Sequence, residues 1–465
     1  MGADGRRLCG QACPAALLLA ACLHFGPAGG ADSSPGGGTF TLSHSLGLVA
    51  RLEGLLQQGN GSDVVLQVQA LGSDEAKTVR AHSLVLALQS EVFRGLLKSR
   101  DATDLVVWES AECTAVFDQF IRYLYCGEMS FSPDQAVPLL KLATKYGVWG
   151  LRQGLVQHMI RRVAGDLPVG RVAAWYEYAA RAKDEALRHS CLRRLSWNLS
   201  SVLRSGEWLR FGAELLATLL RSSDLVLEKE LELFEALEAW MEQQRPDGLT
   251  AETLLQSVRY AMIPPQDLFR IQRHSPVLLR HEESVRSLLY ASYQFHSAPP
   301  LQLAQLLHVN CSLFTPRNYL SPAWGSPWVV GSPARDDRSI TFQTQLGPSG
   351  HDAGRRVTWN ALFSPRWLPL STRTKGQPRV IVTPATSGAD FAGVAFQKTL
   401  ILSSGHDGTA VVRHIYNFHQ STEETTDFLA EADVDAETSE YLTDGSLHFH
   451  VVIKPLYQGL IAAKN

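Results

Sequence analysis

The chain has 465 residues, of which 45% are hydrophobic and 19% charged, and its formal net charge is −3. This composition excludes a disordered chain, and the balanced charge argues against a nucleic-acid-binding surface. Since single hydrophobic cores rarely grow beyond ~250 residues, the length is enough for about three domains.

Residues 1–30 have the order of features that is typical of a cleaved signal peptide. Arg6 and Arg7 precede an apolar run at residues 15–23, and small residues follow at 26–31. The run is shorter than the ~20 residues that cross a bilayer, and no later segment predicts a membrane span. We therefore expect a secreted, extracellular protein; the alternative is a disordered Ala/Gly-rich N-terminus of a cytosolic protein.

Residues 40–160 predict an α/β domain. A helix in SLGLVARLEGLLQQ ends at Gly59, two strands follow in DVVLQVQA and KTVRAHS, then a helix to Leu97, a strand at 105–108 and three more helices. The run AHSLVLA at 81–87 and the spaced aromatic residues from Phe117 to Tyr146 resemble the BTB/POZ fold. In that fold His82 would be a packing residue and not a ligand or base.

The first helix carries an apolar stripe at Leu48, Leu52 and Leu55. In the domains that this region resembles, the helix packs against a partner subunit, which implies a homodimer or a higher homo-oligomer. The alternative is that the stripe packs on its own domain, because a stripe alone does not identify its partner.

Residues 165–295 predict an all-helical domain. The segment from Glu207 to Gln243 resembles a BACK domain, the helical module that commonly follows BTB. Its apolar face is expected to be core, and it consists of Leu231, Phe234, Leu237 and Trp240.

Residues 301–465 change to short alternating apolar and polar runs, punctuated by Pro, Gly, Ser and Asp. This pattern predicts an antiparallel β-sandwich-like domain that folds separately, with Trp324, Trp328 and Trp367 in loops.

No motif of an enzyme is present: there is no nucleophile elbow, phosphate loop or zinc-protease signature. We therefore predict no catalytic residue, no cofactor and no metal. His448 and His450 alternate on an expected strand, so their geometry permits a metal pair, but an exposed strand face explains them without one.

Four cysteines follow the signal segment and are disulfide candidates: Cys113, Cys126, Cys191 and Cys311. Cys113 and Cys126 bracket one expected helix and would lie ~20 Å apart, beyond disulfide reach, and buried free thiols are the alternative. Glycosylation sequons occur at Asn60, Asn198 and Asn310.

Together, a signal peptide, BTB, BACK and a β-rich tail resemble the galectin-3-binding protein family of secreted glycoproteins. YLSPAW at 319–324 and VIKPLY at 452–457 resemble its C-terminal region, although no scavenger-receptor domain fits before residue 40. The resemblance implies a secreted, non-enzymatic, oligomeric glycoprotein of adhesion or matrix type, with other extracellular proteins or glycan-binding lectins as partners.

Two other functions stay open. An intracellular BTB–BACK substrate adaptor for a cullin ubiquitin ligase usually has a hydrophobic-x-Glu element, which KSRDATD at 98–104 lacks. A lectin would stack sugar on Trp324 or Trp328.

Overall fold

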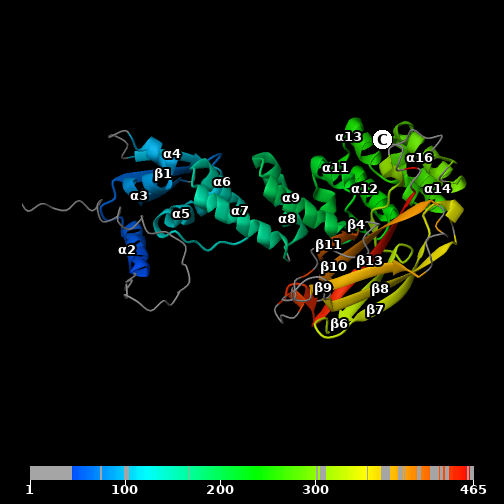
Figure 1. Cartoon of the computed structure of the whole chain (residues 1–465). Helices are drawn as coiled ribbons and strands as arrows, with labels where there is room; N and C mark the ends of the chain where they lie inside the picture. The colour runs from blue at the N-terminus through cyan, green and yellow to red at the C-terminus, as the bar shows by residue number, and fades with distance from the viewer. Residues whose placement is uncertain are drawn as a thin grey trace, which may run out of the picture. The chain divides into compact units, whose positions relative to one another are not determined.

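The computed structural model describes residues 44–73, 76–98, 104–165, 167–299, 302–303, 311–352, 354–367, 377–385, 391, 393–405, 410–418, 429, 433–434, 439–457 and 460. The expected signal peptide and the sequon at Asn310 lie outside these residues. The chain divides into two compact units, Met1–Met159 and Ile160–Asn465 (Figure 1).

The first unit is an α/β domain around a three-stranded sheet of order β2-β1-β3. β1 is antiparallel to β2 and parallel to β3, and its alternate residues, such as Leu66 and Val68, are buried. The elements are α2 (Ser45–Gln58), β1 (Val64–Ala70), β2 (Ala76–Ala81), α3 (Ser83–Gln89), α4 (Glu91–Leu96), β3 (Asp104–Glu109), α5 (Ala111–Cys126), α6 (Ala136–Lys145) and α7 (Trp149–Val163).

The expected single helix up to Leu97 is wrong, because the chain breaks at Ser90 into α3 and α4. Ser90 has extended backbone angles (φ −131°, ψ 121°), and its Oγ accepts a hydrogen bond from the Phe93 N–H at 3.0 Å. The same hydroxyl donates to the Tyr146 carbonyl. A serine that caps a new helix and bonds the core explains the break better than propensity does.

The second unit begins with a helical part, as expected for residues 165–295. The apolar face of α12 is buried throughout, which confirms its assignment to the core. The elements are α8 (Val169–Ala182), α9 (Glu185–Trp197), α10 (Leu199–Arg204), η1 (Glu207–Arg210), α11 (Ala213–Arg221), β4 (Val226–Leu227), α12 (Glu230–Gln244), α13 (Gly248–Leu255), η2 (Tyr260–Met262), α14 (Pro265–His274), α15 (Pro276–Arg280) and α16 (Glu282–Ser297).

The rest of the second unit is a β-sandwich, as predicted. One sheet has β11, β10, β13 and β12 in order, with β6 also paired to β13, and the other has the order β7-β8-β9. Their inner faces form one apolar core, to which Trp359, Leu400 and Val451 belong. The elements are η3 (Cys311–Phe314), β5 (Asn318–Tyr319), β6 (Gly325–Gly331), β7 (Arg338–Gln345), η4 (Gly350–Asp352), β8 (Arg356–Trp367), β9 (Gln377–Pro384), β10 (Val394–Ser404), β11 (Val411–Phe418), β12 (Leu442–Thr443) and β13 (Ser446–Tyr457).

The prediction that Trp328 lies in a loop is wrong, whereas Trp324 does lie in a turn, just before β6, but is buried. Trp328 lies on β6 and is 3% exposed in the sandwich core, and Trp324 is 6% exposed beside Tyr319. The sequence pattern did not predict β6, because β6 contains Pro327. A strand tolerates proline when the strand pairs on one side only, as β6 does with β13. These two residues therefore do not support a lectin. The side chain of Trp367 lies outside the description.

The helical part and the sandwich lie against each other within the second unit, the green helices against the yellow-to-red strands in Figure 1. β4 of the helical part pairs in parallel with β5, so that Val226 is opposite Asn318. The outer face of the larger sheet adds a small apolar cluster in which Val226 meets Ile401, Ile415 and Val452. Separate folding of the tail from residue 301 stays a prediction, and these contacts weigh against it.

Candidate interaction sites

Helix α2 is the first candidate, because none of its residues is buried. Leu48 and Leu52 are half-buried and Leu55 is 37% exposed. α2 contacts α5 of its own domain, and Glu53 accepts a hydrogen bond from Arg122 at 2.7 Å. This bond from Arg122 lowers the pKa of Glu53. The leucine stripe is thus partly covered within the chain and partly open, so its role as a dimer interface stays a prediction.

The turn after α2 presents the sequon at Asn60. Asn60 is exposed, and its carbonyl lies 2.9 Å from His82 Nε2. His82 Nδ1 is 2.8 Å from the Tyr125 hydroxyl, whose pKa burial raises to about 12. His82 therefore fastens the turn to α5, in agreement with its predicted packing role, and the Asn60 side chain stays at the surface.

A buried carboxylate organises the junction between the helical part and the sandwich. Glu230, at the start of α12, is 1% exposed and accepts hydrogen bonds from the Tyr319 hydroxyl at 2.6 Å and the Arg259 N–H at 2.9 Å. Burial alone would raise the pKa of Glu230, but the charge of Arg317 and these hydrogen bonds lower it. The carboxylate is therefore held ionised inside the protein.

Arg317 is the partner of this carboxylate and is fully buried. Its Nε lies 3.1 Å from Glu230 Oε2, and its terminal nitrogens donate to the carbonyls of Leu220, Ser222 and Ser257. The side chain thus comes from the stretch before β5 and bonds three segments of the helical part. Because guanidinium presents five N–H donors in a fixed plane, one side chain bonds the carboxylate and all three carbonyls.

The sequon at Asn198 lies within this junction. Asn198 stands between α9 and α10, its Nδ2 donates to the Arg194 carbonyl at 3.0 Å, and its Oδ1 accepts from the Val412 N–H at 2.8 Å. Both polar atoms of the side-chain amide are thus used in the folded chain. A glycan on Nδ2 would displace the bond to Arg194 and crowd β11.

The cysteines that the structure describes are free thiols. Cys113 and Cys126 lie at opposite ends of α5, as expected, and Cys191 is buried in α9. All three thiols are buried, which is the alternative that the sequence left open, and the pairing of the disulfide candidates stays a prediction. Burial raises the pKa of Cys191 to about 12, so this thiol stays protonated and unreactive. The side chain of Cys311 lies outside the description.

His448 and His450 both project from the outer face of β13, and no metal-binding cluster of His, Cys, Asp and Glu occurs among the described residues. Burial lowers the pKa of His450 to about 4. Within the described parts of the chain, no helix is long and apolar enough to cross a membrane.

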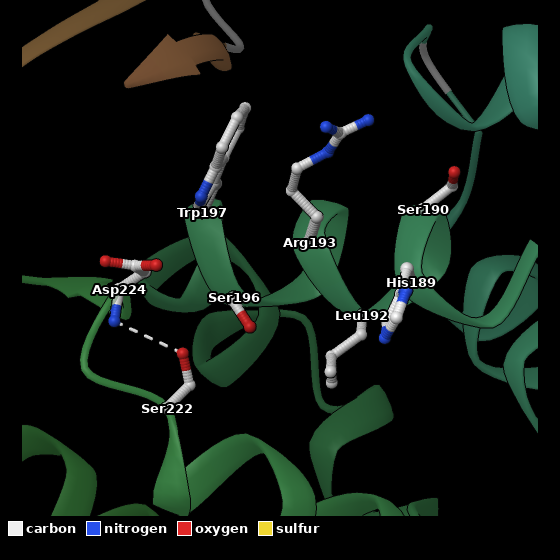
Figure 2. Close-up of a pocket in the computed structure, with 8 residues that line it drawn as sticks. All are labelled: His189, Ser190, Leu192, Arg193, Ser196, Trp197, Ser222 and Asp224. Atoms are coloured by element: carbon white, nitrogen blue, oxygen red, sulfur yellow. Dashed lines mark hydrogen bonds between the residues drawn. The ribbon is translucent and has the colours of Figure 1, made fainter. Parts of the chain in front are cut away.

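A pocket of about 350 Å³ opens beside α9 and is shown in Figure 2. Helix residues one turn apart, His189, Arg193 and Trp197, line it together with Ser222 and Asp224 of the loop that precedes β4. The Arg193 guanidinium lies 5.3 Å from the centre of the Trp197 ring. A second pocket of about 210 Å³ shares Arg193 and Trp197 and reaches β11 and Tyr441.

Three family profiles match consecutive parts of the chain. They are described as "BTB/POZ domain" over residues 52–162, "BTB And C-terminal Kelch" (BACK) over 172–273 and "BTBD17 TRAF domain" over 314–457. The α/β domain, the helical part and the β-sandwich are therefore a BTB, a BACK and a TRAF-like domain.

Among curated proteins, the BTB/POZ domain-containing protein 17 of Mus musculus is 53% identical over 436 residues, which cover 90% of this chain and 90% of the relative. The protein of the same name from Xenopus tropicalis is 48% identical and covers 91% and 94%. The galectin-3-binding protein of Bos taurus is 31% identical over 332 residues, 70% of this chain and 58% of the relative.

Proposed function

We propose that this chain, which belongs to the family of BTB/POZ domain-containing protein 17, is a secreted, non-enzymatic, oligomeric glycoprotein of adhesion or matrix type. A role in protein–protein interaction follows from the BTB domain, since such domains typically oligomerise. Secretion, glycosylation and adhesion are the finer parts of the proposal. They are supported by the signal-like N-terminus, the exposed Asn60 and the similarity to galectin-3-binding protein.

The observation that carries the proposal is the open apolar stripe of α2. A helix with Leu48, Leu52 and Leu55 on one stripe, none of them buried, leaves apolar surface that a second copy would cover. A fully exposed Leu that becomes buried contributes ~1.5–3 kcal/mol. Six leucines, half-covered already, would contribute on the order of 5–9 kcal/mol toward an association cost of ~4–15 kcal/mol.

The partner class follows from the same features. Oligomerisation multiplies the glycans and surface patches that a single chain carries, which strengthens weak contacts to other extracellular proteins or to glycan-binding lectins. The relative's name states that it binds galectin-3, and this chain would offer N-linked glycans to lectins of that kind.

Expression of the full chain in mammalian cells tests the proposal. We expect the protein in the culture medium without residues 1–30, with a mass that N-glycosidase lowers and a native mass of at least two chains by light scattering. An unglycosylated cytosolic protein that keeps Met1 would contradict secretion and favour the alternative, a substrate adaptor for a cullin ubiquitin ligase. A monomer over a wide concentration range would contradict oligomerisation.

A further inference from the structure

The pocket beside α9 has walls that are fixed before any ligand arrives. On the loop side, the Asp224 N–H donates to Ser222 Oγ at 3.2 Å, and the buried Arg317 holds the Ser222 carbonyl. The next residue, Ser223, accepts a hydrogen bond from Arg259 at 2.8 Å. The loop that carries Asp224 is therefore anchored to the buried charge cluster, so that this exposed carboxylate has a defined place.

The helix wall is equally ordered. Trp197 contacts His414 of β11 with ring centres 5.8 Å apart, and His414 in turn lies 4.2 Å from the ring centre of Tyr416. Arg193 stands one turn before Trp197 and covers part of the indole, as Figure 2 shows. The indole thus has a fixed orientation and separates the two pockets.

The polar groups of the pocket are of mixed sign. Arg193 and Asp224 are both exposed, and among the described residues neither side chain forms a salt bridge. Burial lowers the pKa of Lys454, and the charge of Asp224 opposes this shift. Arg193 offers planar N–H donors and Asp224 offers acceptors, while His189 and Ser222 do both. Arg193 and Asp224 have opposite charges, so the pocket does not present a single sign of charge to a ligand.

We propose that this pocket binds a neutral hexose unit of a glycan. A pyranose ring presents polarised C–H groups that fit the negative face of the indole, and its hydroxyl groups both donate and accept. The alternating donors and acceptors of Arg193 and Asp224 match such a ligand. Since exposed ion pairs contribute little, a small charged ligand would gain less here. The second pocket, which extends the first past Trp197, gives room for a neighbouring sugar.

The site differs from the oligomer interface and does not depend on it. It lies in the second unit, on α9 and the loop before β4, whereas the leucine stripe lies in the first unit. Failure of sugar binding would leave the proposed secretion and oligomerisation unaffected, and a monomeric protein would still have the pocket.

Saturation-transfer difference NMR on the full chain tests the proposal. The purified protein, first treated with N-glycosidase so that no glycan of its own competes, is mixed with galactose, mannose, glucose and N-acetylglucosamine in turn. A hexose has about 12 non-hydrogen atoms, which at ordinary ligand efficiency gives a Kd on the order of 1 mM. We expect ring C–H protons of at least one sugar to receive saturation.

Exposed substitutions then locate the binding. Arg193→Ala and Asp224→Ala each remove hydrogen bonds to a charged group, so we expect the Kd to rise about tenfold or more. Arg188→Ala is the matched control, because Arg188 lies on the same helix, bonds Glu185 and does not line the pocket. Thermal melts confirm that the variants are folded.

Two results would overturn the proposal. One is that no sugar receives saturation, or that both pocket variants bind as well as the control does. The other is that glycylglycine, a zwitterion, or sulfated galactose binds while neutral hexoses do not, which would assign the pocket to a peptide or an anion.

Discussion

Replacement of Arg317 by Met should destabilise the second unit more than any surface change. The substitution keeps most of the side-chain volume but leaves the Glu230 carboxylate buried with no cation beside it at 3.1 Å. Breaking a buried ion pair costs about 3–5 kcal/mol. The carbonyls of Leu220, Ser222 and Ser257 also lose a donor, so this range is a lower bound.

This loss of free energy is large compared with the total free energy of unfolding of a domain, which is typically ~5–15 kcal/mol. In a unit of this size, 1 kcal/mol shifts the melting temperature by roughly 2 °C. We therefore expect Arg317→Met to lower the Tm of the second unit by at least roughly 6–10 °C, as measured by differential scanning calorimetry at pH 7. Arg210→Met is the matched control, because Arg210 forms an exposed pair with Glu207, and such a pair is worth ~0–1 kcal/mol.

A second substitution separates charge from packing. Glu230→Gln added to Arg317→Met removes the unpaired charge while the Tyr319 hydroxyl keeps an oxygen to donate to. We expect the double variant to recover part of the lost stability, since the remaining cost is that of unmade hydrogen bonds. A drop for Arg317→Met no larger than that of Arg210→Met would refute the reasoning, as would a double variant that is less stable than Arg317→Met.

Three further predictions follow from the same structure. Leu52→Asp with Leu55→Asp should halve the native mass in light scattering, whereas Leu249→Asp, which also replaces an exposed leucine, should not; a folded double variant of unchanged mass would move the interface elsewhere. Asn60→Gln should lower the mass of the secreted protein by one glycan, whereas Asn198→Gln should leave the mass unchanged and lower the Tm; a mass loss at Asn198 would contradict this. The reason is that the half-buried Asn198 amide bonds the backbone of α9 and β11, whereas the exposed Asn60 amide bonds the exposed Gln58 side chain. Burial lowers the pKa of Lys454 to about 8 in the folded state, so its contribution to stability rises between pH 8 and pH 10.5 and is lost as the pH falls through this window. Lys454→Met should remove that rise and stabilise the protein at pH 7 by up to about 3 kcal/mol in urea unfolding, and an unchanged pH dependence would contradict the burial argument.

The order of the domains could be predicted from the sequence because each domain has its own period. In a helix or a strand with one buried face, apolar residues recur at the spacing of that element, and this spacing can be read from the sequence. β6 was missed because Pro327 interrupts the pattern, although Trp328 sits where a core residue is needed. The break at Ser90 was missed because helix propensity alone does not show a hydroxyl that bonds a distant carbonyl.

The charge cluster could not be predicted for a similar reason. Glu230 and Arg317 are 87 residues apart, and each resembles an ordinary surface charge in its own segment. Glu230 begins a helix, where an acidic residue is favourable on local grounds alone. The pairing of β4 with β5 places the segment of Arg317 beside the start of α12, where Glu230 lies. The pocket beside α9 depends on the same pairing, because its loop is held by Arg317.

The strength of the single pocket bears on the number of copies that the protein needs. Linking two sites gives an effective concentration in the mM range, and a Kd on the order of 1 mM is no smaller than that. The second site of a dimer would then strengthen binding by only about twofold, whereas each further copy multiplies the effect again. A dimer with this pocket would therefore be a poor adhesion protein, and a higher homo-oligomer an effective one. The leucine stripe of α2 is proposed to join two copies. If sugar binding is weak and adhesion is strong, more than two copies are needed, so the stripe cannot be the sole contact between copies.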